Sequence, residues 1–141
     1  MESTTQKIIR KTGRKPIDCK CSLCKQQCKQ VCLGTPDDIM KIADAGYGNL
    51  LKYTDWWAGV SHGVSPIRMV QLELTNNGCV CFVNGLCILH DKGLKPTEGK
   101  LSHHSTTMDN FKFRKSLSWN VAKEWIAIEN KELVQEILNA F

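Results

Sequence analysis

The sequence contains no long run of apolar residues and no motif of the commonest enzyme classes. Its uninterrupted apolar stretches are well below the roughly 18 residues that span a bilayer. The chain does not open with the pattern of a secretory signal. It has no glycine-rich phosphate loop and no nucleophile elbow, and its 141 residues are too few for a (β/α)8 barrel. We therefore expect a soluble cytoplasmic protein without a membrane segment.

Cysteine is abundant, with 8 residues in two tight groups. Eight cysteines could form disulfides in a small secreted domain, but a reducing cytosol disfavours that interpretation. Clustered thiolates in such a compartment are typical of metal sites, although a single cysteine is often only a small buried apolar residue. The predicted metal ligands are Cys19, Cys21, Cys24, Cys28, Cys32, Cys79, Cys81 and Cys87.

Eight cysteines match the ligands of two four-cysteine sites. Zinc is the first prediction, because a closed shell of four thiolates is the usual structural zinc site. An iron–sulfur cluster is the alternative, since four cysteines ligate it too. The formal net charge is +5, but two zinc ions held by eight thiolates carry about −4. The basic excess is therefore weak evidence for a nucleic-acid partner.

Spacing limits which cysteines of the first group can share a metal. If residues 24–32 are helical, Cys24 and Cys32 lie roughly 12 Å apart along the helix axis. Two sulfurs on one zinc ion are only about 4 Å apart. Cys24 and Cys28 can then share a metal, whereas Cys32 belongs to a second site or to the core.

The second group lies on a predicted β-hairpin around Asn84-Gly85, a strong two-residue turn signal. Such a turn pairs Val83 with Leu86, Cys81 with Ile88 and Cys79 with His90. Cys79, Cys81 and His90 then share one face, and Cys87 points to the other. Either a bulge in the hairpin brings Cys87 to the same face as Cys79 and Cys81, or each face of the hairpin contributes ligands to a different metal ion.

The pattern predicts a small α+β domain with a three-stranded antiparallel β-meander and about five helices around a cysteine-rich metal centre. Residues 1–18 form a basic, flexible arm in this prediction, and residues 19–141 form the metal-binding domain. Helices are expected from Thr35-Pro36 to Gly46 and over 49–57, 119–129 and 131–141. The meander comprises residues 67–74, 79–83 and 86–90, whereas 91–118 is polar and loop-like.

Two aromatic features are weaker signals. Adjacent Trp56 and Trp57 predict one core and one surface ring. Aromatic and basic residues alternate as in a strand at Phe111, Lys112, Phe113 and Arg114, and Lys115 follows them. The rings of such a strand could stack on the bases of single-stranded nucleic acid, and its cations could neutralise the phosphates. A solvated edge is the more ordinary interpretation of that segment.

The order of these elements resembles the YkgJ-type cysteine-cluster family of zinc- or iron-chelating proteins. A dense cysteine group precedes Thr35-Pro36-Asp37-Asp38-Ile39 and Lys41-Ile42-Ala43, as in that family. The later segment from Cys79 to His90 also follows the family pattern, so the likeness covers about residues 19–91. It implies a metal-chelating domain, and the best-matched ligand positions are Cys21, Cys24, Cys28, Cys81 and Cys87.

The sequence departs from the family pattern after the second cysteine group, where the usual "RP-x-x-C" is missing. His90, His103 and His104 are candidate additional ligands, although a solvated polar loop explains the last two as well. We expect a binding or adaptor module with a protein partner rather than an enzyme, because a closed cysteine shell leaves no position for catalytic water. The alternatives are an electron-transfer role for an iron–sulfur cluster, or nucleic-acid binding through the basic N-terminal arm.

Overall fold

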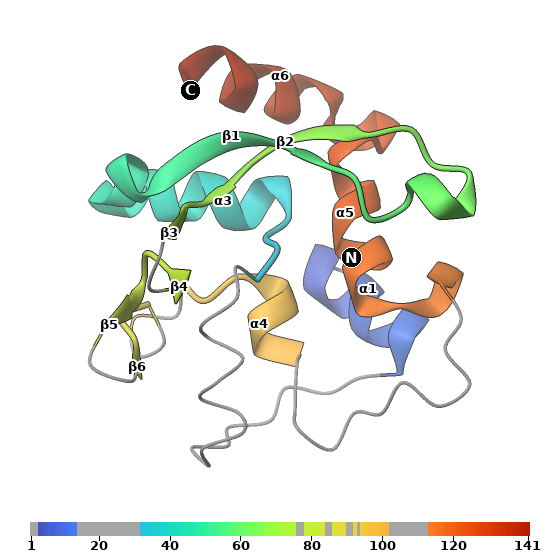
Figure 1. The fold of residues 1–141 in the computed structure, drawn as a ribbon, viewed down its shortest axis with the longest axis horizontal. Coiled ribbons are helices and arrows are strands. Elements are labelled where there is room, and N and C mark those ends of the chain that lie inside the picture. The colour runs from blue at the N-terminus through green and yellow to red at the C-terminus, as the bar shows by residue number, and fades with distance from the viewer. Residues whose placement is uncertain are drawn as a thin grey trace.

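Helices and short antiparallel strands alternate in the computed structural model, which describes residues 3–13, 32–75, 78–83, 86–89, 92, 94–101 and 113–141. The α+β class is confirmed (Figure 1). The α-helices are α1 (Thr4–Thr12), α3 (Pro36–Ile42), α4 (Thr97–Leu101), α5 (Leu117–Ala122) and α6 (Lys131–Ala140). The strands are β1 (Leu51–Trp56), β2 (Ile67–Leu72), β3 (Leu74–Thr75), β4 (Gly78–Cys79), β5 (Phe82–Val83) and β6 (Leu86–Cys87). Short 3-10 turns cover Gly48–Leu50, Val60–His62, Phe113–Lys115, Lys123–Trp125 and Ile128–Asn130.

Helix α3 begins where the sequence predicts. The Thr35 hydroxyl accepts a hydrogen bond from the Asp38 N–H, and the Asp38 carboxylate accepts one from the Thr35 N–H. This reciprocal capping box satisfies two N–H groups that a helix start leaves without partners. A π-helical turn (Ala43–Tyr47) continues the helix, and Gly46 ends it with a φ of 97°, a conformation that favours glycine.

The main sheet is a pair of antiparallel strands, β1 and β2. Its register runs from Leu51 opposite Leu72 to Trp56 opposite Ile67. The predicted helix over 49–57 is therefore wrong from Leu51 onward. This segment is rich in aromatic and β-branched residues, which fit a strand once β2 supplies the backbone partners.

The remaining described strands form two more two-stranded ladders, β3–β4 and β5–β6. Among the described residues, the predicted three-stranded meander is therefore wrong, because β2 pairs with β1 and β4 pairs with β3. The pairing of Val83 with Leu86 around the predicted turn is confirmed. Cys79 pairs with Leu74, and its predicted partner His90 lies outside the described residues.

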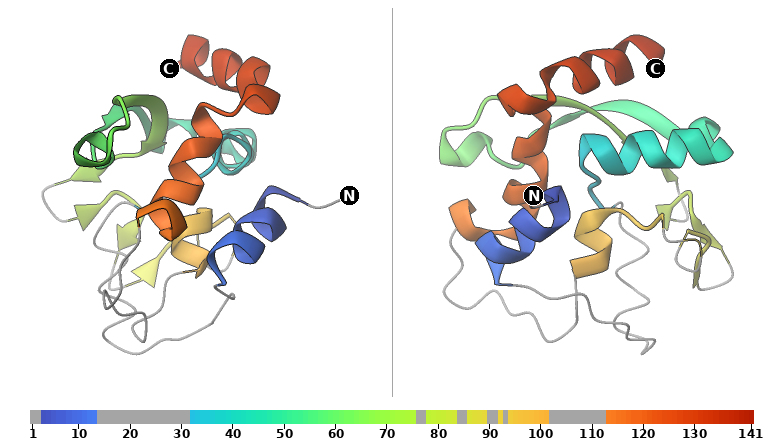
Figure 2. Two further views of the ribbon diagram at one scale, coloured as in Figure 1. Left: turned by 90° about the vertical axis from the view of Figure 1, so that its right-hand side faces the viewer. Right: turned by 180° about the vertical axis from the view of Figure 1, so that it is seen from behind.

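The predicted N-terminal arm is wrong over residues 4–12, which form α1. Ser3 caps this helix, and Ile8 is completely buried. Ile8 packs against a second, smaller core cluster completed by Leu101, Leu117 and Val121. Figures 1 and 2 show α1 beside α5. The arm prediction failed because the buried partners of Ile8 lie more than 90 residues away in the sequence.

The C-terminal region also follows the prediction in part. Helix α6 confirms the expected 131–141 helix, whereas the expected 119–129 helix starts earlier and ends at Ala122 before two 3-10 turns. Within the predicted 91–118 loop the chain forms α4 and the Phe113–Lys115 turn. The predicted strand around Phe113 is therefore wrong at residues 113–115.

The main core lies between the β1–β2 sheet, α3 and α6, with α6 across the top of the view in Figure 1. Its buried members include Ile39, Ile42, Met69, Val70, Leu89, Trp125 and Ile137. None of the helices in the described part of the chain has the length and apolar character needed to span a bilayer.

Candidate metal centre

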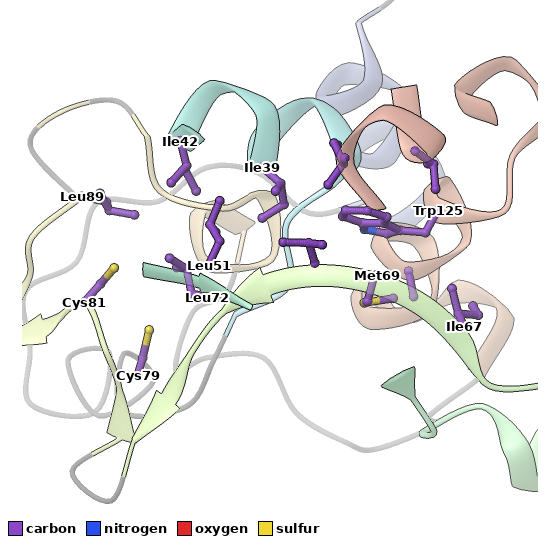
Figure 3. Close-up of a cluster of buried hydrophobic side chains, with 14 of the residues drawn as sticks. Ile39, Ile42, Leu51, Ile67, Met69, Leu72, Cys79, Cys81, Leu89 and Trp125 are labelled. Atoms are coloured by element: carbon purple, nitrogen blue, oxygen red, sulfur yellow. The ribbon is translucent and has the colours of Figure 1, made fainter. Parts of the chain in front are cut away.

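Two of the predicted ligands, Cys79 and Cys81, lie together at one end of the main core. Cys79 ends β4, and Cys81 occupies the turn before β5. Cys79 is 7% exposed and Cys81 is 0% exposed. Figure 3 shows both sulfurs near Leu72 and Leu89, at the opposite end of the cluster from Ile67. Both side chains are therefore buried in the same part of the core.

The β5–β6 ladder has the register of a regular two-residue hairpin. Val83 pairs with Leu86 and Phe82 pairs with Cys87. The Ile88 N–H donates to the Cys81 carbonyl oxygen at 2.9 Å, which continues this register. The ladder contains no bulge at these pairs, so the alternative in which a bulge brings Cys87 alongside Cys81 is wrong here. The alternative with metals on two faces stays a prediction.

The first cysteine group ends at Cys32, which is half-buried. The segment that follows it is hydrogen-bonded to α4. The Leu33 N–H donates to Glu98 Oε1 at 3.0 Å, and the Glu98 N–H donates to the Leu33 carbonyl oxygen at 3.0 Å. Ser118 donates its hydroxyl to Glu98 Oε2 at 2.6 Å. Glu98 therefore connects the residue after Cys32 to both α4 and α5.

The next residue, Gly34, is held by two buried side chains. Its N–H donates to Gln71 Oε1 at 2.8 Å, and its carbonyl oxygen accepts from Gln71 Nε2 at 3.0 Å. The same carbonyl oxygen accepts from the Trp125 indole N–H at 2.8 Å. A Cβ atom on Gly34 would lie 3.1 Å from both Asp38 and Ile39, so the close packing also favours glycine.

Asp38 extends this attachment to the start of α4. Its Oδ2 atom accepts from the Thr35 N–H at 3.0 Å, the Thr97 N–H at 2.9 Å and the Thr97 hydroxyl at 2.5 Å. The exposed fractions are 8% for Asp38 and 0% for Thr97. Three donors at one oxygen offset the cost of burying a carboxylate.

These contacts define an anchor for the chain on the C-terminal side of the first cysteine group, made by Gln71, Trp125, Asp38, Thr97 and Glu98. The sequence predicted only the local part of it, the Thr35 and Asp38 helix start. In the sequence Gln71 alternates with the apolar Val70 and Leu72, a pattern that predicts a solvent-facing side chain, yet Gln71 is 2% exposed. A polar residue inside an apolar strand was the available signal for such a buried hydrogen-bonding role.

The structure tests only part of the predicted ligand set. Cys19, Cys21, Cys24 and Cys28 lie outside the described residues, as do His90, His103, His104 and the side chain of Cys87. Among the residues that the structure describes, no group of three or more His, Cys, Asp or Glu side chains is placed to hold a metal ion. The metal centre therefore stays a prediction, and three of its predicted ligands are described, Cys32, Cys79 and Cys81.

A charged cluster lies where α1 meets the end of α5. Lys7 donates to both carboxylate oxygens of Glu124, at 2.7 and 2.9 Å. Burial opposes the charge on Lys7, but Glu124 and Glu129 together raise its pKa. At Lys123, burial and the adjacent Lys11 ammonium lower the pKa to about 8. For Glu129, its own backbone N–H and then Lys7 lower the pKa.

Comparison of the chain with protein-family models, with curated proteins and with solved structures found no match in any of the three.

Proposed function

We propose that this protein is a metal-chelating domain in which its clustered cysteines hold zinc in structural sites. The burial of Cys79 and Cys81 at one end of the core carries the proposal. Each of the strands β3 to β6 is only two residues long. Such short ladders are at best marginally stable without further support, and a metal bound by thiolates is a common way to supply it.

The anchor at Gly34 supports the same proposal from the other cysteine group. A loop that carries several ligands binds metal more tightly when its end is already fixed, because less conformational freedom is lost on binding. Hydrogen bonds from three different parts of the fold fix the chain within two residues of Cys32. The likeness to the YkgJ-type family in the order of these segments supports the proposal as well.

The proposed role is that of a binding or adaptor module for a protein partner, without catalysis at the metal. Thiolate-rich shells occupy every coordination position of zinc and weaken it as a Lewis acid. An iron–sulfur cluster is the second candidate, since the same cysteines suit it. Visible absorption of anaerobically purified protein separates the two, because zinc sites are colourless and iron–sulfur clusters are brown.

The proposal is tested with Cys81→Ala, which removes a predicted ligand but keeps the site apolar. Metal content and thermal stability are measured beside Cys32→Ala, the cysteine that spacing assigns to a second site or to the core. Cys81→Ala should lose metal and stability together, because zinc binding contributes on the order of 10 kcal/mol to folding in small zinc modules. Full metal content in both variants and in Cys24→Ala would show that these cysteines only pack.

A further inference from the structure

A stack of aromatic rings connects the interior to a loop on the surface. The loop between β1 and β2 carries His62, whose ring lies parallel to that of Phe113, with centroids 4.2 Å apart and 2° between the planes. Phe113 in turn contacts Trp119, 5.3 Å away, and Trp56, 6.3 Å away. Trp119 is almost completely buried, whereas His62 is exposed. The stack therefore ends on a ring in contact with solvent.

The loop that holds His62 is rigidly built. The His62 N–H donates to the Gly59 carbonyl oxygen at 2.9 Å, and the Val64 N–H donates to the same oxygen at 3.0 Å. A Cβ atom on Gly59 would lie 2.9 Å from Val64 and 3.0 Å from Trp56, so the loop packs closely on the rings beneath it. Figure 1 shows this loop projecting at the edge of the molecule, away from α6. The exposed ring is thus held in position before any ligand binds.

One cation lies beside the end of this stack, and a second follows it in the chain. Arg114 lies over the rings of Phe113 and Trp119, 5.6 and 5.0 Å from their centroids, and donates to the His62 carbonyl oxygen at 3.4 Å. Lys115 is its exposed neighbour. No carboxylate of the described residues forms an ion pair with either cation. The remaining guanidinium N–H groups of Arg114 are suited to a phosphate.

The same loop exposes a second large ring, Trp57, which is 64% exposed. We propose that the surface formed by Trp57, His62, Arg114 and Lys115 binds single-stranded nucleic acid, with a base stacked on His62 and phosphates held by the two cations. Parallel aromatic platforms beside basic side chains are the recurring features of single-strand binding sites. A duplex does not fit this chemistry, because its bases are not available for stacking on a side chain.

The test measures binding of a fluorescent oligothymidylate of about twelve nucleotides, within the length that one single-strand-binding domain covers, to the full metal-loaded chain. His62→Ala should weaken binding at least about fivefold, as expected for loss of one stacked base. His62→Phe should bind within about twofold of the wild type, because the ring is kept. Trp57→Ala should also weaken binding, whereas Ile128→Ala, which removes an 86% exposed side chain elsewhere, should not.

Salt dependence tests the cations separately. Lys115→Gln should reduce the slope of log affinity against log salt by about 0.7, the contribution of one phosphate contact on a single strand. Lys131→Gln, on the exposed start of α6, should leave the slope unchanged. This measurement keeps the proposal testable if His62→Ala does not fold.

Several results would overturn the proposal. Unchanged affinity in His62→Ala would exclude stacking on this ring, and equal losses in His62→Ala and His62→Phe would assign the effect to the imidazole rather than to a stacked ring. Displacement of the oligonucleotide by inorganic polyphosphate at an equal phosphate concentration would show that the binding is electrostatic and involves no stacked base. Binding to phosphatidylserine vesicles without binding to the oligonucleotide would assign the surface to a membrane.

Discussion

The side-chain amide of Gln71 forms two hydrogen bonds with the backbone of Gly34, one in each direction, at 2.8 and 3.0 Å. These bonds connect the middle of β2 with the segment that follows the first cysteine group. Both partners are buried, so water cannot replace a lost bond. The anchor at Gly34 therefore fixes the chain close after the first cysteine group.

Gln71→Leu should lower the free energy of unfolding by about 1–3 kcal/mol, because it leaves the buried Gly34 N–H without a partner. Urea unfolding at saturating metal measures the change. Gln135→Leu is the control, since Gln135 is exposed on α6, and it should change stability by less than about 0.5 kcal/mol. Similar small losses in both variants would contradict the anchor.

Thr97→Val should destabilise the protein by about 1.5–3 kcal/mol, because the buried Asp38 carboxylate loses a hydroxyl donor. The variant keeps the shape of the side chain and the backbone N–H bond. Thr54→Val, on the exposed part of β1, provides the comparison. Equal thermal unfolding of the two variants would show that the hydroxyl contributes nothing.

Ile8→Ala should lower the free energy of unfolding by about 2–5 kcal/mol, as expected when a fully buried isoleucine is truncated. Ile9→Ala should cost less, because Ile9 is only partly buried. Deletion of residues 1–12 should destabilise the protein at least as much as Ile8→Ala. A deletion variant with unchanged unfolding would restore the flexible-arm prediction.

Lys123 should titrate with a pKa of about 8, because burial and the Lys11 ammonium disfavour its charged form. The unfolded chain then binds more protons at this site between about pH 8 and the ordinary lysine value of 10.5, so this site makes stability rise with pH in that interval. The pKa of Lys7 is raised instead, and its contribution is lost only above 10.5. Lys11→Gln should raise the pKa of Lys123, as measured by NMR titration of its side chain. An ordinary lysine pKa for Lys123 in the wild type would contradict this account.

Local signals predicted the elements that depend only on neighbouring residues. Thr35 and Asp38 cap α3, and the two-residue hairpin pairs Val83 with Leu86, as the sequence indicates. The strand β1 was predicted as a helix, because its pairing with β2 is a tertiary interaction. Gln71 was misplaced for the same reason, since its partner Gly34 lies 37 residues away. Spacing alone identified the cysteines as candidate ligands. It did not predict the hydrogen bonds that fix the chain beside Cys32.

The most direct test of the central claim is the metal-to-protein ratio of the full chain purified without oxygen, measured by elemental analysis. The proposal predicts at least about one tightly held zinc or iron per chain, because a single four-cysteine site is its minimum. The ratio should fall in Cys81→Ala and stay unchanged in Gln135→Leu, which alters an exposed side chain on α6. A ratio below about 0.2 in the wild type would contradict the proposal, since even one structural site requires a value near one.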